Sequence, residues 1–280
     1  MISFLRTCAA RGKRMLKARA PLFYARCSRM LEVRRRRSFR DRVVTHNYGS
    51  GPLTIWLANA MAQAWYDSDW AELPEIAILR RGRLRNGARV FDLGAHHGVV
   101  ALMLAREVGP EGQVVAVEAD PFAFSVLQRN KELNHASQLK VIHAAIQDRS
   151  GRLASVAPSP EGPSDRLLDW GDQKVSGLSL DDMTREFGRP DVIFVDVDGF
   201  DCHVLRGGRE TLAGKPDCFI EIHVACGLEK EGGSVAEALS YFPAQEWNLQ
   251  IASDDAREFV PFAPDHPLLS QRFFLIATAK

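Results

Sequence analysis

The sequence lacks any apolar run that could cross a membrane, and it is poor in cysteine. A membrane-spanning helix needs roughly 20 apolar residues, and no stretch approaches that length. The five cysteines are odd in number and show no CxxC spacing, which excludes a regular disulfide framework. The basic N-terminus has no apolar core of a secretory signal, although an acid-poor start is also typical of organelle transit peptides. We therefore expect a reduced, cytoplasmic protein without a transmembrane segment.

The near-neutral net charge of +1 conceals a strong asymmetry along the chain. Residues 1–42 contain 14 of the 36 Lys and Arg but only 2 of the 35 Asp and Glu, so they carry +12 against −11 for the rest. This pattern predicts a solvated basic arm over residues 1–50, for which contact with an anionic surface is the alternative. Apart from Phe39, no aromatic residue interleaves the arginines of "EVRRRRSFRDR", whereas a stacking platform would require several, which argues against nucleic acid.

Residues 51–86 are predicted to form a helical cap. Apolar residues recur there at intervals of three and four, at Ile55, Ala58, Met61 and Trp65. The aromatic residues of this segment are expected either to cover a pocket as a lid or to belong to an ordinary core; they are Trp65, Tyr66 and Trp70.

Residues 87–280 alternate between apolar, strand-like runs and helical patterns. The expected strands are 88–93, 113–117, 139–145, 191–197, 217–223, 247–252 and 272–279. The expected helices are 97–107, 121–133, 182–186, 202–212 and 234–241, with a loop over 150–177. Because the strands are almost continuously apolar, both faces of the sheet must be covered. The sequence thus predicts an α/β, Rossmann-like doubly wound domain.

The stretch "VFDLGAHHGVV", residues 90–100, is the predicted ligand loop at the end of the first strand. Its glycines, Gly94 and Gly98, have GxxxG spacing rather than the GxGxxG of dinucleotide sites. Asp92 would repel a pyrophosphate but suits the ammonium and sulfonium of S-adenosyl-L-methionine. Glu118 follows Gly98 by 20 residues, where an acid commonly accepts hydrogen bonds from ribose hydroxyls, although it could merely end a strand.

Asp148 lies beyond the third predicted strand, in "AAIQDRSG". An acid at this place is expected to accept a hydrogen bond from the adenine amino group. The alternative is an aspartate that stabilises the turn at Ser150 and Gly151.

Four ordered blocks of this sequence resemble the FkbM family of S-adenosylmethionine-dependent methyltransferases. The blocks run from "VFDLGAHHGVV" through "LSLDDM" and "DVIFVDVDGFDCHVLRGG" to "CFIEIH". The resemblance implies a class I fold with a seven-stranded sheet whose last strand is antiparallel, and O-methylation of sugars, glycans or natural products. It places the cofactor against Asp92, Gly94, Ala95, Gly98, Glu118, Ala119 and Asp196, and aligns Asp198 and Gly199 with the family's fourth-strand motif. The sequence departs from the family at Phe194, where a lysine is usual, at Asp198, where a glutamate is usual, and at His96 and His97.

Five polar residues are expected to converge where the fourth and fifth strands end: Asp196, Asp198, Asp201, Glu221 and His223. We predict that the catalytic residues are Asp196, Asp198 and His223, with His223 as general base and Asp196 orienting the substrate or the methionyl ammonium. A core role for His223 and a helix-cap role for Asp201 are the alternatives.

Metal binding is a second interpretation of the same strand ends. Asp196, Asp198 and Glu221 could together supply oxygen ligands to Mg²⁺. The turn expected at Gly199 would separate the two aspartates, however, and His96 and His97 have no metal-ligand spacing, so the sequence predicts no metal site.

The sequence thus predicts an S-adenosyl-L-methionine-dependent O-methyltransferase with a small-molecule or glycan substrate. The alternative is an inactive scaffold on the same fold, recruited through its basic arm, which Phe194 would favour. A nucleic-acid methyltransferase is disfavoured because no aromatic-proline motif follows Asp196.

Overall fold

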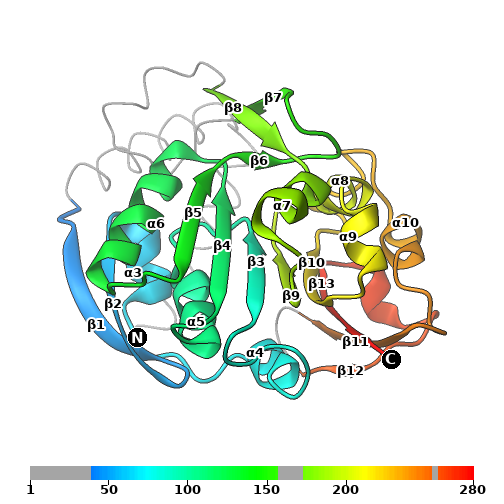
Figure 1. Ribbon diagram of the computed structural model, residues 1–280, viewed down its shortest axis with the longest axis horizontal. Helices are drawn as coiled ribbons and strands as arrows, with labels where there is room; N and C mark the ends of the chain where they lie inside the picture. Colours follow the sequence, from blue (N-terminus) through cyan, green and yellow to red (C-terminus); the bar gives the residue numbers. More distant parts are fainter. Residues whose placement is uncertain (1–38, 157–172, 254–257) are drawn as a thin grey trace, which may run out of the picture.

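The computed structural model describes residues 39–156, 173–253 and 258–280, so most of the predicted basic arm lies outside the described residues. Its centre is an eight-stranded sheet with the order β12-β11-β13-β10-β9-β3-β4-β5 (Figure 1). These strands are β3 (Arg89–Leu93), β4 (Gln113–Glu118), β5 (Leu139–His143), β9 (Val192–Val195), β10 (Asp217–Ile222), β11 (Trp247–Ser253), β12 (Val260–Pro261) and β13 (Phe273–Ala279).

The five strands from β5 to β10 are parallel, whereas β13 is antiparallel to both β10 and β11. The predicted doubly wound sheet with an antiparallel last strand is therefore confirmed. The predicted count of seven strands is one too low, because Val260 and Pro261 pair with Ile251 and Gln250 and add β12 at the edge.

The central sheet is covered on both faces. Neighbouring residues of a strand enter different clusters: Val90 and Val192 pack with one, and Phe91 and Ile193 pack with the other. This is the period-two alternation of a strand that is buried on both sides. The helices are α3 (Ala60–Tyr66), α4 (Pro74–Leu79), α5 (Val99–Val108), α6 (Pro121–Leu133), α7 (Leu180–Phe187), α8 (Asp201–Arg206), α9 (Arg209–Ala213) and α10 (Val235–Ser240), with a short 3-10 helix, η2 (Pro267–Ser270). None of the helices in the described ranges is long and apolar enough to cross a membrane.

The segment before the central sheet differs from its predicted helical form. Residues 42–57 form an antiparallel hairpin of β1 (Arg42–Tyr48) and β2 (Gly51–Leu57), which crosses the predicted boundary at residue 50 (Figure 1). Leu53, Ile55 and Leu57 are buried and alternate with partly exposed residues, so the period is two over these residues. The predicted helix begins only at α3.

The free edge of this hairpin is bound by side chains of α6. Asn134 Oδ1 accepts a hydrogen bond from the backbone N–H of Thr54 at 2.9 Å, and Asn130 Oδ1 accepts one from Trp56 at 2.8 Å. The two asparagines satisfy backbone groups that an edge strand would otherwise leave unpaired.

Two further differences concern the second half of the chain. The predicted loop over 150–177 contains two strands, β7 (Leu153–Val156) and β8 (Gln173–Leu178), which form a small sheet with β6 (Ala145–Ile146). Residues 157–172 of that loop lie outside the described residues. The single helix predicted over 202–212 is divided into α8 and α9 at Gly207 and Gly208.

Candidate active site

The loop after β3 is pressed against the chain that follows β9. Gly94 has φ +89°, and a Cβ at this position would lie 1.7 Å from the carbonyl oxygen of Asp196. Gly98 has φ +81°, and its Cβ would lie 2.2 Å from Leu127 Cδ1. The backbone N–H groups of Gly94 and Ala95 both donate to the carbonyl of Val117, at 2.9 and 3.0 Å. Only glycine allows this loop to lie so close to the neighbouring strand ends.

Asp92 lies under this loop as a buried acid without a counter-charge. Its side chain is 5% exposed, and its Oδ2 has no hydrogen-bond partner within the described ranges. Burial first, and then the charges of Asp196 and Glu118, raise the pKa of Asp92 to about 7. A buried carboxylate with this environment fits a cationic ligand such as the methionyl end of S-adenosyl-L-methionine, and it does not fit a pyrophosphate.

Glu118 ends β4 and is held in place by the backbone on both sides. Its Oε2 accepts the N–H of His96 at 2.7 Å, and its Oε1 accepts the N–H of Asp120 at 2.7 Å. Burial raises the pKa of Glu118, although these two hydrogen bonds act in the opposite direction. A carboxylate has about four acceptor sites, so its two oxygens can also accept hydrogen bonds from a vicinal diol.

Two other residues are predicted to contact the cofactor, Ala119 and Asp148. The carbonyl oxygen of Ala119 is 3.0 Å from His143 Nε2, and the His143 ring stacks on Phe124 at 4.8 Å. Asp148 follows β6 and lies beside Gly207, whose Cβ would be 3.0 Å from the Asp148 Cα.

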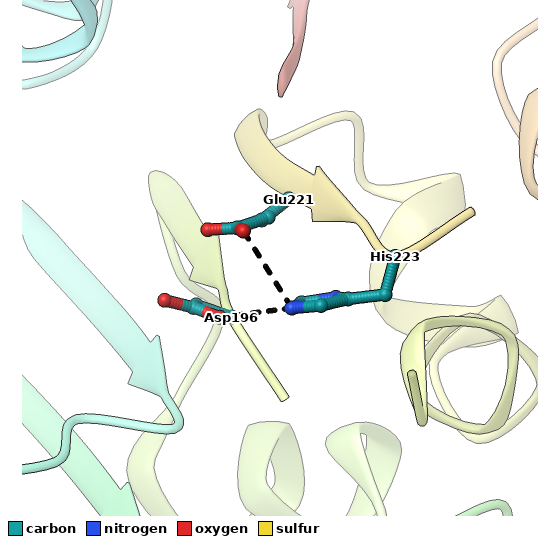
Figure 2. A group of neighbouring side chains, drawn as sticks. All are labelled: Asp196, Glu221 and His223. Atoms are coloured by element: carbon teal, nitrogen blue, oxygen red, sulfur yellow. Dashed lines mark ion pairs between the residues drawn. The ribbon is translucent and has the colours of Figure 1, made fainter. Parts of the chain in front are cut away.

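The ends of β9 and β10 bring together all five polar residues expected there. His223 is 3% exposed, and its Nε2 faces three carboxylate oxygens: Asp196 Oδ1 at 3.5 Å, Glu221 Oε1 at 3.6 Å and Asp198 Oδ1 at 3.7 Å. Figure 2 shows Asp196 and Glu221 converging on this nitrogen. The expectation that the turn at Gly199 separates Asp196 from Asp198 is therefore wrong, since both reach His223. With φ +48° at Asp198 and +95° at Gly199, the chain curls back toward the ring after β9 ends.

Asp201 orients the imidazole of His223. The carboxylate of Asp201 is fully buried and accepts hydrogen bonds from both the ring Nδ1 and the backbone N–H of His223. The alternative helix-cap role is not observed, because Asp201 is the first residue of α8 and the N-cap position is Phe200. Burial would lower the pKa of His223, but Asp201, Glu221 and Asp196 outweigh it and raise this pKa to about 9.

The two histidines of the glycine loop pack into an aromatic group from α3. Their rings stack at 4.0 Å with an angle of 12°, and His96 Nδ1 lies 3.0 Å from the hydroxyl of Tyr66. The carbonyl of His97 accepts a hydrogen bond from Asn130 Nδ2 at 2.8 Å. Trp65 lies 5.8 Å from the His96 ring and is 55% exposed. Both histidines are therefore loop residues that are held by backbone hydrogen bonds and by ring packing.

Phe194, which replaces the family's usual lysine, is a core residue. It is 3% exposed, and its ring lies 5.2 Å from that of Phe219. Phe219 in turn stacks on Phe274 at 5.5 Å. The substitution therefore changes the packing of one sheet face.

Sequence reasoning missed Arg272, which lies just before β13 and 3.2 Å from Glu221 Oε1. This contact joins segments that are far apart in the sequence, and no local motif marks it.

Comparison with known proteins supports the same family. A family model described as the methyltransferase FkbM domain matches residues 92–247. The chain is 32% identical to a catechol O-methyltransferase of Mycobacterium tuberculosis, over 53% of this chain and 66% of that protein. It is 26% identical to the 2-O-methyltransferase NoeI of Sinorhizobium fredii, over 44% of this chain and 58% of that protein. The chain thus spans less than two thirds of the length of these curated relatives.

Solved structures with similar folds include an FkbM methyltransferase from Methylobacillus flagellatus. It has a TM-score of 0.44 and 18% identity, and the match covers 68% of this chain and 43% of that one. The cofactor of this family is S-adenosyl-L-methionine, which the unpaired Asp92 and the glycine loop fit. Since the family model covers more than half of the sequence, this chain belongs to the FkbM methyltransferase family.

Proposed function

We propose that this protein is an S-adenosyl-L-methionine-dependent O-methyltransferase whose acceptor is a hydroxyl of a sugar, a glycan or a small natural product. The observation that carries the proposal is the unpaired, buried Asp92 under a glycine loop that lies directly against Asp196. The site for a cationic donor thus lies beside a group of acids that can face an acceptor hydroxyl.

The cofactor roles proposed for this chain follow from its contacts. Asp92 faces the positive methionyl end, and the backbone of Gly94, Ala95 and Gly98 lets the ligand approach closely. Glu118 accepts the ribose hydroxyls, with Ala119 beside it. Asp148 accepts the adenine amino group.

When bound, the cofactor would supply a methyl group on a positively charged sulfur for transfer to the acceptor oxygen, with the electron pair of the broken carbon–sulfur bond left on the sulfur. We assign the hydroxyl proton to a carboxylate oxygen of Asp196, whose side chain is 56% exposed and can pass the proton on to water. His223 and Asp198 border Asp196 and position it. A protonated His223, which a pKa of about 9 implies at neutral pH, cannot itself accept a proton, and this favours Asp196 over the sequence-based assignment of the base.

The relatives support oxygen as the atom that is methylated, because two of them are named as O-methyltransferases. The cytoplasmic location and an anionic contact through residues 1–42 stay predictions, and deleting that segment tests the second of them.

Two measurements test the proposal. Calorimetry with S-adenosylhomocysteine should show binding by the wild type and weaker binding by Asp92→Ala, with Glu111→Gln as a control, because Glu111 lies just before the start of β4 and the site lies at its other end. Labelled cofactor should then transfer its methyl group to a hydroxyl compound in a cell extract. Absence of binding by the wild-type protein would rule out the proposed function. Binding without transfer to any acceptor would favour the inactive scaffold.

A further inference from the structure

The imidazole of His223 is held so that one nitrogen points into a group of carboxylates. Nδ1 lies 3.0 Å from Asp201 Oδ1, and because a carboxylate only accepts, this nitrogen carries the proton in the neutral ring. In that neutral ring the lone pair of Nε2 is directed at Asp196 and Glu221 (Figure 2). Asp198 faces the same nitrogen.

None of the three contacts of Nε2 is a normal hydrogen bond. The distances are 3.5, 3.6 and 3.7 Å, whereas an N–H···O bond is usually about 2.7–3.2 Å long. Either a proton on Nε2 or a bound cation can hold three anionic oxygens around this nitrogen. The near-equal distances fit a central ion better than a single proton, which would draw one oxygen closer than the others.

The negative charge around His223 also favours the binding of a cation. Four carboxylates surround the ring, from Asp196, Asp198, Asp201 and Glu221. Arg272 is one cation that contacts them, 3.2 Å from Glu221. A divalent ion would offset part of the negative charge that is concentrated around this ring.

From this geometry we propose that Asp196, Glu221 and His223 bind a divalent metal ion. One donor atom from each of the three lies within 4.8 Å of the others. An ion with bonds of about 2.1 Å places its ligand atoms about 3–4.2 Å apart, so only a small closure is required. Asp198, at the exposed rim, is the candidate for a fourth ligand. The hydrogen bond from Nδ1 to Asp201 is the outer contact that orients metal-binding histidines in general.

The donor set indicates the kind of ion. Carboxylate oxygens suit Mg²⁺, Ca²⁺ and Mn²⁺, whereas imidazole suits the transition metals. Mn²⁺ accepts both ligand types, and it is the ion we expect to bind. This site differs from the magnesium set considered from the sequence alone, because His223 is a ligand rather than a base.

The role of the ion rests on the proposed function. An acceptor hydroxyl bound to the ion would lose its proton at lower pH, because the positive charge stabilises the resulting oxyanion. The proton would pass to the oxygen of Asp196 that does not face His223, and the oxyanion would then form the bond to the methyl carbon as the carbon–sulfur bond breaks and leaves its electron pair on the sulfur. The open side of Asp196 and Asp198 is where such an acceptor would enter.

The test is direct titration of the metal-free, full-length protein with Mn²⁺, with the free ion followed by electron paramagnetic resonance. The wild type should bind one Mn²⁺ per chain, and Asp196→Asn and Glu221→Gln should each weaken binding at least tenfold. Glu246→Gln is the matched control, since Glu246 pairs with Lys215 just before β10 and β11 begin, at the opposite end of β10 from the site, and should bind as the wild type does. Circular dichroism checks that Glu221→Gln is folded, and Asp196 is exposed enough to be replaced without disturbing the core.

A wild-type protein without a saturable Mn²⁺ site overturns the proposal, as does an Asp196→Asn variant that binds Mn²⁺ normally. Calorimetry with S-adenosylhomocysteine in the presence of a chelator separates this result from the proposed function. Cofactor binding without Mn²⁺ binding contradicts the metal site alone. Mn²⁺ binding without cofactor binding contradicts the methyltransferase alone.

Discussion

Asp201 holds His223 with both oxygens of one carboxylate. Oδ1 lies 3.0 Å from the ring Nδ1, and Oδ2 accepts the backbone N–H of the same residue at 2.9 Å. The first residue of α8 is thereby joined to the residue that follows β10. The orientation of the imidazole, and with it the whole strand-end cluster, depends on this buried aspartate.

Replacing Asp201 by asparagine should therefore destabilise the protein. The amide group can accept only through its oxygen, so one of the two N–H groups of His223 loses its partner, at a cost of about 1–3 kcal/mol. Urea unfolding at neutral pH measures this loss. Asp198→Asn is the control, because that side chain is fully exposed, and its stability should stay within about 0.5 kcal/mol of the wild type. Equal stabilities for the two variants would contradict the orienting role of Asp201.

Asp92 should make the stability of the ligand-free protein depend on pH. Its pKa is raised from 3.8 to about 7, so between these values the folded state holds a proton that the unfolded state has lost. The free energy of unfolding must then fall as pH rises from about 4 to 7, by up to about 4 kcal/mol from this group. Asp92→Asn should flatten the dependence, as followed by urea unfolding at pH 5 and pH 8. Glu111→Gln is the control and should keep the pH dependence of the wild type. If Asp92→Asn keeps it as well, the buried acid is not the source of the pH dependence.

Substitutions at Gly94 and Gly87 distinguish the effect of close backbone approach from the effect of backbone strain. Both have positive φ, +89° and +80°, but a Cβ on Gly94 would meet the carbonyl of Asp196, whereas a Cβ on Gly87 would meet nothing within 4 Å. Gly87→Ala should cost about 1–2 kcal/mol of strain. Gly94→Ala should cost more, because the backbone must move as well, and it should weaken the binding of S-adenosylhomocysteine. Chemical unfolding and calorimetry provide the two measurements, and similar losses for both variants would show that the close approach is unimportant.

Glu118 is expected to contribute to cofactor binding through its remaining acceptor sites. Glu118→Ala removes the acceptors for the ribose diol and for the N–H groups of His96 and Asp120, so affinity for S-adenosylhomocysteine should fall by about 1–3 kcal/mol. Glu118→Gln keeps the shape and one acceptor oxygen, so its loss should be smaller. Calorimetry of both variants measures the effect. Unchanged affinity in Glu118→Ala would count against the ribose role.

Restoring the family's usual lysine at position 194 should destabilise this protein. Phe194 packs against Phe219 in the core, and a lysine there would lose this aromatic contact and bury an ammonium group. Burying a charge is costly even where a carboxylate is near, so Phe194→Lys should unfold at clearly lower urea concentration. Phe194→Leu keeps an apolar side chain and should lose less. A Phe194→Lys variant as stable as Phe194→Leu would indicate that this position opens to water.

Strong local sequence patterns are sufficient to predict much of the fold. The helix predicted over 121–133 is α6, because Asp120 and Pro121 mark its start locally. The glycine loop with Asp92 was recognisable because the need for φ above zero selects glycine. Residues 51–57 were predicted as helix and form a strand, since their apolar residues fit a helical period over too short a range. Pairing with Arg42–Tyr48 and the two asparagines of α6 decide that structure, and neither is visible in a local window.

The sequence by itself determined the parallel sheet, the ligand loop and the identity of the acids that follow each strand. Periodicity, glycine positions and charge are properties of neighbouring residues, so they can be read along the chain. Only the tertiary structure decided that Asp201 binds His223 rather than capping a helix, and that Asp196, Asp198 and Glu221 face one nitrogen. Those relationships depend on distances between segments up to 27 positions apart in the sequence (Asp196 to His223), which are set by the twist of the sheet and the curl at Gly199.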